Sequence, residues 1–191
     1  MHGQHLATIA EKNSATIGWE AAVGGGIPCI RTLRQGCAAN NINYAAGILN
    51  GTCNFILTTM KETGRTFDDV LSEAQELGYA ETPPDLDVDG IDTAHKIALV
   101  AAVSTGCLPS FDAVHTEGIR SISGHDVTLA DQLGYSIKLL GIASTSAESS
   151  SVLQRVHPAL IPNDSALGAT HGVLNALYTL VSLKTPNFFT V

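Results

Sequence analysis

The apolar positions at the start of the chain predict a helix, a strand and a second helix. Residues 4–12 place their apolar side chains on one helical face. Residues 16–23 are rich in β-forming side chains and run into three consecutive glycines, so we expect a strand that ends in a turn. Pro28 suits the first turn of the next helix, where apolar residues recur at helical spacing through Cys37. A helix that opens almost at the first residue leads us to expect a chain that starts inside a domain.

The next stretch carries helix start and stop signals. An apolar run predicts a strand over 43–49, followed by a helix over 50–62 that opens on an Asn-Gly-Thr cap and closes at a glycine. Thr66 and Asp69 form a short-armed capping box for another helix, which ends at Gly78. The apolar stripe of that helix consists of Val70, Leu71, Ala74 and Leu77.

The remaining pattern predicts a loop, helices and strands. The acidic, proline-containing segment 79–90 is expected to be an extended loop, and residues 92–105 form the most apolar helix. A helix near 129–135 leads into strands over 138–145 and 150–156, with a serine-rich turn between them. The last apolar stretch, GVLNALYTLVSL, fits a buried strand or a buried helix. Strands interleaved with helices predict an α+β, α/β-like fold in which helices cover a mixed β-sheet.

Composition and charge exclude several classes of protein. The chain has 191 residues, 45% of them hydrophobic, which is enough for a domain with a buried core. Ten Lys and Arg against eighteen Asp and Glu give a net charge of -8 without a basic run, so we expect no nucleic-acid partner. The longest apolar run, 97–103, is too short to cross a membrane. Four cysteines without metal or disulfide spacing, and no export signal, predict reduced core thiols in a cytoplasmic protein.

Lys96 stands out because it borders an apolar segment and lies close to many carboxylates. On a helix, Asp92 and Lys96 are four residues apart and share a face. The preceding loop supplies Glu81, Asp85, Asp87 and Asp89. A lysine among carboxylates in a cleft suits proton transfer or recognition of a substrate ammonium. The alternative is an exposed ion pair that contributes only a few tenths of a kcal/mol. His95, on the apolar face of the same helix, is expected in the core.

The glycine-rich turn at 24–26 has two interpretations. It follows a predicted strand, but the dinucleotide-binding pattern G-x-G-x-x-G fails because its last position is Cys29. One interpretation is a turn that requires positive φ. The other is that carbonyl groups of the turn converge with Glu20 on a cation.

Three segments carry a family resemblance. EAAVGGGIP at 20–28, GILNGTCNFILT at 47–58 and ELGYAETPPDLDVDGIDTAHK at 76–96 resemble, in this order, the substrate-binding and dimerisation domain of homoserine dehydrogenases. The likeness runs over about residues 1–175. It implies a two-domain oxidoreductase that interconverts L-homoserine and L-aspartate 4-semialdehyde with NAD(P), in threonine and methionine biosynthesis.

The resemblance also implies roles for individual residues. Lys96 matches the family's general acid/base. Asp92 and Glu81 match the residues that hold homoserine, with Asp87 as a nearby carboxylate. Gly78 and Glu81 match positions at which members of the family contact the nicotinamide end of the cofactor. A monovalent cation site, usually sodium, is matched by Glu20 with the carbonyls of Val23, Gly25 and Ile27.

The resemblance divides the chain into three parts. Residues 1–20 match the end of the nucleotide-binding domain, residues 21–180 match the catalytic and dimerisation domain, and residues 181–191 form a tail without an assigned role. We therefore expect a homodimer or higher homo-oligomer that acts on a small molecule, and no turnover by this chain alone. The alternative is a noncatalytic oligomerisation or small-ligand-binding module. The four charges at Glu81, Asp87, Asp92 and Lys96 favour the enzyme, since a scaffold needs none of them.

Overall fold

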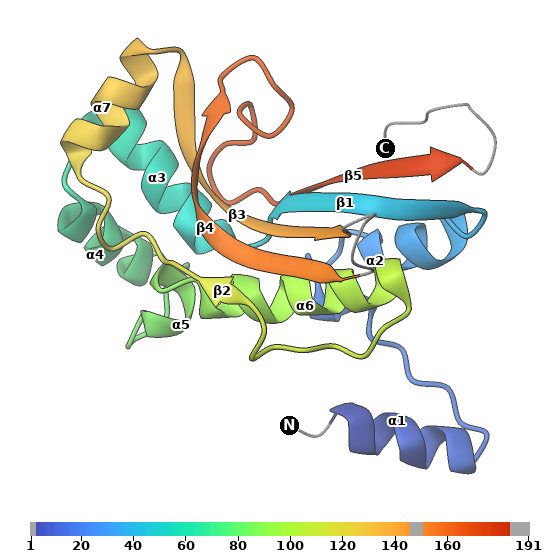
Figure 1. Cartoon of the computed structure of the whole chain (residues 1–191). Coiled ribbons are helices and arrows are strands. Elements are labelled where there is room, and N and C mark those ends of the chain that lie inside the picture. The colour runs from blue at the N-terminus through green and yellow to red at the C-terminus, as the bar shows by residue number, and fades with distance from the viewer. Residues whose placement is uncertain (1–2, 146–150, 184–191) are drawn as a thin grey trace.

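A five-stranded mixed sheet forms the centre of the fold, and helices lie along one of its faces (Figure 1). The computed structural model describes residues 3–145 and 151–183. The strands are β1 (Asn40–Ile48), β2 (His115–Thr116), β3 (Tyr135–Thr145), β4 (Val152–Pro162) and β5 (Ala176–Leu183), in the order β2-β4-β3-β1-β5. Neighbouring strands are antiparallel except β2 and β4. The predicted α+β fold is confirmed, and the last apolar stretch is a strand.

The helices place the main core against one face of the sheet. They are α1 (Gly3–Lys12), α2 (Cys29–Arg31), α3 (Gly51–Thr63), α4 (Phe67–Glu76), α5 (Asp85–Val88), α6 (Ile91–Thr105) and α7 (Gly124–Gln132), with a 3-10 turn at Glu20–Ala22 and a π-helical turn at Thr32–Gly36. The apolar helix α6 packs on β1, β3 and β4, and buries Ile97 and Val100 against Leu139 and Val156. No helix in residues 3–145 and 151–183 is long and apolar enough to cross a membrane.

The predicted helix signals of the middle segment are confirmed. The Asn50 side chain accepts a hydrogen bond from the Cys53 amide at 2.8 Å and caps α3, and Gly64 closes that helix with a φ of 69°. Thr66 accepts from the Asp69 amide at 3.3 Å at the start of α4. Leu77 departs from the predicted apolar stripe, because α4 ends at Glu76 and leaves the Leu77 side chain exposed.

Several predicted strands differ in extent, most of all 150–156, which is β4 over Val152–Pro162, and three other elements differ in type or starting point. Residues 16–23 contain a 3-10 turn at Glu20–Ala22 rather than a strand, because no strand of the described chain lies beside them to complete a ladder. Segment 79–90 contains α5, whose first turn carries acidic residues, as the helix dipole favours. The helix predicted near 129–135 begins at Gly124, because Ser123 and Asp126 form a capping box that the sequence analysis overlooked.

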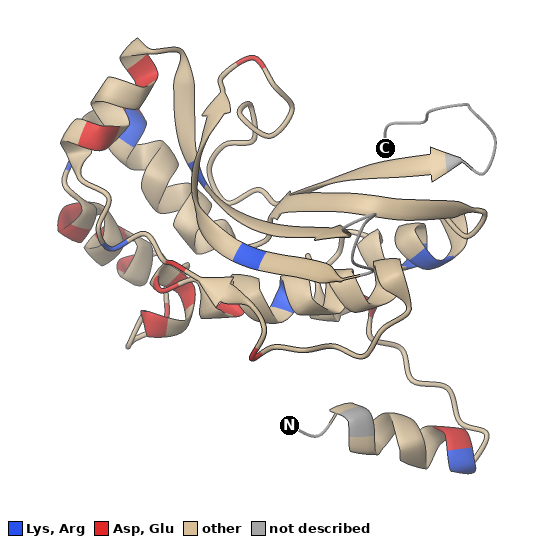
Figure 2. Cartoon of the chain, in the orientation of Figure 1, with Lys and Arg blue, Asp and Glu red and all other residues tan. Residues whose placement is uncertain are grey.

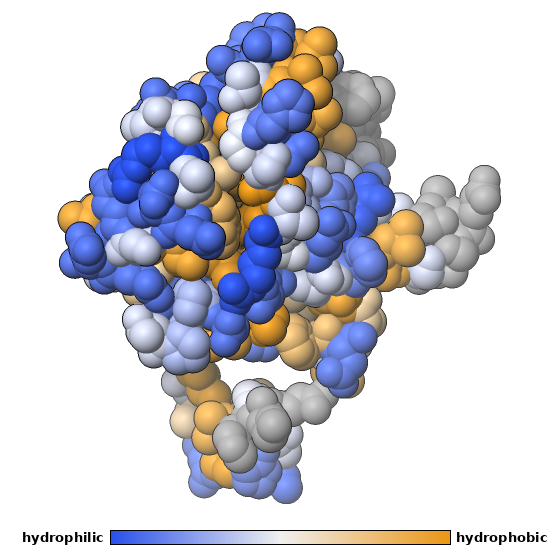
Figure 3. All heavy atoms as spheres, turned by 90° about the vertical axis from the view of Figure 1, so that its left-hand side faces the viewer, coloured by the Kyte–Doolittle hydropathy of each residue, from blue (hydrophilic) through white to orange (hydrophobic). Residues whose placement is uncertain are grey.

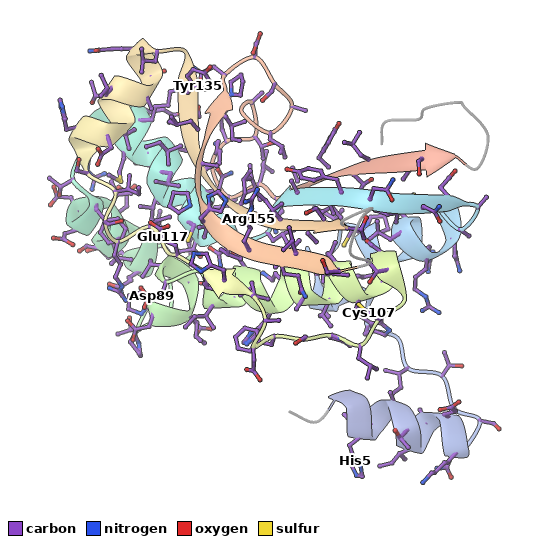
Figure 4. All side chains as sticks on the ribbon, in the orientation of Figure 1. His5, Asp89, Cys107, Glu117, Tyr135 and Arg155 are labelled. Atoms are coloured by element: carbon purple, nitrogen blue, oxygen red, sulfur yellow. The ribbon has the colours of Figure 1, made fainter. Side chains whose placement is uncertain are left out.

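Two predictions of burial are also wrong. His95 is exposed and packs at a tilt against Phe111, with 4.1 Å between the ring centroids, instead of entering the core. Cys29, Cys37 and Cys53 are buried free thiols, as predicted, but Cys107 is exposed just beyond the end of α6 (Figure 4).

The two ends of the chain differ in how they join the sheet. Helix α1 stands apart from the rest in two perpendicular views (Figures 1 and 3). At the other end, residues 181–183 of the expected tail belong to β5, while residues 184–191 and the serine-rich turn at 146–150 lie outside the described residues.

Candidate active site

An open cleft of about 390 Å³ forms where segments far apart in the sequence meet. Its lining comes from the start of α3, the turn after α4, helices α5 and α6, and the loop before β5. The lining residues are Asn50, Gly51, Thr52, Gly78, Tyr79, Asp87, Asp92, Lys96 and Val173. Four of the predicted site residues therefore come together: Lys96, Asp92, Asp87 and Gly78. Glu81 is exposed on the nearby loop and is not among the lining residues.

Lys96 is held in place by two hydrogen bonds from its ammonium. Nζ donates to Oδ2 of Asp92 at 2.6 Å and to the Leu49 carbonyl at 2.8 Å. The Lys96 and Asp92 side chains are only 22% and 31% exposed. The bond to Leu49 ties α6 to the end of β1, which an ordinary surface pair between neighbouring turns would not do. The amine therefore lies at a fixed point of the cleft, where a proton can be passed to or from a bound molecule.

Asn50 connects the two carboxylates of the cleft, a role that the sequence analysis missed. Its Nδ2 donates to Oδ1 of Asp87 at 2.8 Å and to Oδ2 of Asp92 at 2.9 Å, while its Oδ1 caps α3. The available signal was the residue type, because an asparagine cap leaves its amide donors free for acidic neighbours. The other oxygens, Oδ2 of Asp87 and Oδ1 of Asp92, accept no hydrogen bond from the described residues.

The acidic residues in and next to α5 fall into two groups according to their partners. Asp85 and Asp89, four residues apart, both pair with Arg120, a second residue that the sequence analysis did not single out. Asp87 lies between them in sequence and faces Asn50 and the cleft. Figure 2 shows the acidic residues of α4 and α5 gathered beside the N-terminal end of α6. One carboxylate of α5 is thus available to a ligand, and two stabilise the loop.

The turn after α4 forms another wall of the cleft. The Thr52 hydroxyl donates to the Tyr79 carbonyl at 2.5 Å, and the Phe55 ring packs against the Tyr79 ring with centroids 5.2 Å apart. Gly78 has a φ of 74° and no heavy atom within 4 Å of where a Cβ would lie. The backbone at Gly78 is therefore open to a molecule in the cleft.

Cys53 lies beneath the cleft and is kept neutral. Burial raises the pKa of its thiol well above the usual value, and the charges of Asp87 and Asp92 raise it further. Its Sγ donates to the Asp87 carbonyl at 3.2 Å. The thiol therefore supports α5 and is not suited to act as a nucleophile.

The predicted cation ligands lie in a separate turn before α2. Both oxygens of Glu20 accept amide hydrogen bonds, from Ile30 at 2.7 Å and from Arg31 at 2.9 Å. The Cys29 thiol donates to the Val23 carbonyl at 3.0 Å. Gly24 and Gly25 have φ values of 71° and 58°, so the interpretation of a turn with positive φ is confirmed. Carboxylate and carbonyl oxygens retain free lone pairs and suit a hard cation.

Comparison with known proteins identifies the family. The model of the homoserine dehydrogenase family matches residues 28–187 of the chain. The chain belongs to the homoserine dehydrogenase family. A homoserine dehydrogenase of Pseudomonas aeruginosa is 50% identical over 177 residues, which cover 93% of this chain and 40% of that protein. One from Neisseria gonorrhoeae is 47% identical over 92% of this chain and 40% of its own length. The chain spans about 40% of the length of these curated relatives.

Solved structures of homoserine dehydrogenases share the fold. The crystal structure of the Thiobacillus denitrificans protein has a TM-score of 0.90 and 43% identity, and the match covers all of this chain and 44% of that one. A hyperthermophilic archaeal homoserine dehydrogenase in complex with NADPH has a TM-score of 0.78 and 28% identity, covering all of this chain and 54% of that one. The mixed sheet with its helices is therefore the architecture of this family.

Proposed function

We propose that this chain provides the substrate-binding and proton-transfer part of an enzyme that interconverts L-homoserine and L-aspartate 4-semialdehyde with NAD(P). The observation that carries the proposal is the Lys96 amine, fixed between Asp92 and the Leu49 carbonyl in the cleft of a homoserine dehydrogenase family member.

The proposed chemistry moves a proton at the terminal oxygen of the substrate. Oxidation of homoserine removes a hydride from the C4 carbon and a proton from its hydroxyl group. NAD(P), when bound, supplies the hydride acceptor or donor. In its neutral amine form Lys96 accepts the hydroxyl proton in this direction, and in its ammonium form it donates that proton to the carbonyl oxygen in the reverse direction. Asp92 accepts a hydrogen bond from Lys96 and so fixes the direction in which Nζ points.

The charges of the cleft suit the rest of an amino-acid substrate. We assign the substrate ammonium to the free oxygens of Asp87 and Asp92, together with Glu81 of the adjacent loop. The substrate carboxylate faces the N-terminal turn of α3, where the helix dipole favours a negative group. Gly78 and Glu81 are proposed to meet the nicotinamide end of the cofactor, an assignment supported by the family resemblance and, at Gly78, by the open backbone.

Three further parts of the proposal rest on the resemblance and on general features of the chain. A monovalent cation, sodium, would bind Glu20 and the carbonyls of Val23, Gly25 and Ile27, where it would stiffen the glycine turn. The active form would be a homodimer or higher homo-oligomer. The location would be the cytoplasm, where the three buried free thiols would stay reduced.

Steady-state kinetics of the enzyme expressed from its complete coding sequence test the proposal. We expect formation of NADH or NADPH that requires L-homoserine. A folded protein that binds homoserine but turns it over with neither cofactor would contradict the proposal and support the noncatalytic ligand-binding module.

A further inference from the structure

Lys138 on β3 is a buried lysine that the proposed reaction does not use. Its side chain is 2% exposed. Nζ donates to Oδ1 of Asn54 at 2.9 Å and to the Thr170 carbonyl at 2.6 Å. Among the described residues no carboxylate pairs with it, and burial together with the nearby charge of Lys61 lowers the pKa of Lys138 to about 8.

The partners of Lys138 anchor the loop over 170–174 to α3. Asn54 of α3 donates from Nδ2 to the carbonyls of Thr170 at 3.2 Å and Leu174 at 3.0 Å. The amide of Gly172 donates to the Thr58 hydroxyl at 3.3 Å. The Thr170 carbonyl thus accepts from both Lys138 and Asn54, and Lys138 joins β3, α3 and the loop at one point.

This loop forms one wall of the cleft. Val173 lies in its middle and lines the cleft with Lys96, Asp92 and Asp87. The Val173 carbonyl lies directly over Gly51, the first residue of α3, where an added Cβ would be 2.7 Å from the carbonyl oxygen. Contact with Gly51 prevents the loop from moving inward, and the bonds to Lys138 and Asn54 prevent it from moving outward.

Stability alone does not explain a lysine at this position. Burying an ammonium without a carboxylate partner is unfavourable, and a well-packed apolar side chain of similar length is often at least as stable. A strand residue that faces a protein interior is most simply an aliphatic one. The donors of Lys138 instead meet two oxygens that fix the loop behind Val173.

We propose that Lys138 is a positioning residue for the homoserine cleft: through the Thr170 carbonyl and Asn54 it holds residues 170–174 against α3, so that Val173 forms a fixed apolar wall beside the substrate's methylene groups. This inference rests on the proposed function. Lys138 does not line the cleft and makes its hydrogen bonds to Asn54 and Thr170, so its loss weakens substrate binding and leaves the chemical step in place.

The test combines hydrogen exchange with kinetics in the enzyme expressed from its complete coding sequence. Lys138→Met keeps the length of the side chain and removes its donors. We expect amide exchange over residues 168–176 to become at least about tenfold faster, while α6 exchanges as before. We expect KM for homoserine to rise about five- to tenfold and kcat to stay within about twofold.

Lys61→Met is the matched control, because Lys61 is a partly buried lysine near Lys138 that binds other groups. Its ammonium contacts Ser136 and Asn163 at 2.9 Å and Asp131 at 2.7 Å, none of them in the loop over 170–174. We expect unchanged exchange over 168–176 and an unchanged KM. If Lys138→Met does not fold, Lys138→Gln, which keeps one amide donor, should show the same changes to a smaller extent.

Two results would overturn the inference. One is unchanged exchange over 168–176 or an unchanged KM in the folded Lys138 variant. The other is an equal effect of Lys61→Met, which would indicate a general loss of packing. Failure of the proposed function is seen separately, as absence of homoserine turnover in the unaltered enzyme, while the exchange experiment still decides whether Lys138 holds the loop.

Discussion

Asn50 holds two carboxylates together with a single amide group. Oxygens of Asp87 and Asp92 accept from the same nitrogen, so the two negative charges lie close to each other on one side of the cleft. Like charges at this separation repel, and the Asn50 amide together with the Lys96 ammonium offsets that repulsion. The cleft therefore presents concentrated negative charge, with one free oxygen from each carboxylate.

Two substitutions of Asn50 separate its capping role from its bridging role. Asn50→Ser keeps a good helix cap and loses the bridge, so the free energy of unfolding should fall by less than about 1 kcal/mol while KM for homoserine rises. Asn50→Asp also keeps the cap, but its carboxylate would repel Asp87 and Asp92 and displace the free oxygens that face the substrate, so KM should rise further, by about tenfold or more. Denaturant unfolding and steady-state kinetics measure both effects. Unchanged KM values in both variants would show that the bridge does not serve binding.

Lys138 should give the stability of the protein a defined pH dependence. Folding lowers the pKa of Lys138 from 10.5 to about 8, chiefly through burial, with Lys61 lowering it and Glu62 raising it. Between these values the unfolded chain binds the proton and the folded chain does not, so the contribution of Lys138 to the free energy of unfolding rises with pH. Its unfavourable contribution, up to about 3 kcal/mol, is complete below pH 8 and disappears as the pH approaches 10.5.

The comparison of unaltered protein with Lys138→Met isolates this dependence from the other titrating groups. Urea unfolding at several pH values between 7 and 10 gives the difference in free energy of unfolding between the two proteins. We expect the free energy of unfolding of the unaltered protein to rise relative to that of Lys138→Met as the pH rises through this window. A difference that is constant with pH would contradict the lowered pKa.

Helix α5 depends on a close backbone contact with the segment before α7. The Ile119 amide donates to the Val88 carbonyl at 2.8 Å, and a Cβ on Gly118 would collide with the backbone of Val88 and Asp89. Because α5 carries Asp87, this contact determines where one of the cleft carboxylates lies.

Gly118→Ala should therefore displace α5. We expect the free energy of unfolding to fall by about 2 kcal/mol or more, together with weaker homoserine binding because Asp87 moves. Gly124→Ala is the control, since the atom nearest to its added Cβ is 3.9 Å away. Unfolding curves and KM values of the two variants are compared. Equal behaviour of both would show that the contact with α5 is not tight in solution.

Local signals predicted some elements well and could not predict others. The Asn50 cap and the Gly64 stop act within a few residues of the chain, so α3 was predictable. The bridge from Asn50 to Asp87 and Asp92 spans 37 and 42 residues, which no local pattern contains. The segment 16–23 has strand-like composition, but a strand also needs a neighbouring strand to form backbone hydrogen bonds with. Lys138 is recognisable as a strand residue, whereas its burial depends on the distant loop over 170–174.

At the scale of the whole molecule, the face of the sheet opposite α6 bears an apolar cluster. Its buried members are Ala46, Ile48, Leu140 and Ile142. The apolar stretch GILNGTCNFIL is largely buried within the chain, at Ile48, Leu49 and Ile56 among others. Exposed apolar side chains occur instead at Leu153 of β4 and Leu180 of β5. They pair with Ser144 and Tyr44, respectively, and so share the face of that cluster.

A homodimer that covers this face remains our prediction. Light scattering at micromolar concentration should give the mass of two chains, or of a multiple of two. The double substitution of Leu153 and Leu180 by Asp should lower that mass to a single chain without unfolding it, since both side chains are exposed. The control is Leu108→Asp, which is also exposed but lies on the loop after α6. A single-chain mass for the unaltered protein at every concentration would contradict the prediction.

The most direct test of the central claim measures homoserine oxidation by Lys96→Ala in the enzyme expressed from its complete coding sequence. If Lys96 carries the proton, kcat should fall by about 10² to 10⁴ with the circular dichroism spectrum unchanged. Asp92→Ala should raise KM and also lower kcat, because Asp92 fixes Nζ of Lys96 as well as facing the substrate. Near-normal turnover by folded Lys96→Ala would contradict the account and reduce the pair of Asp92 and Lys96 to a structural contact.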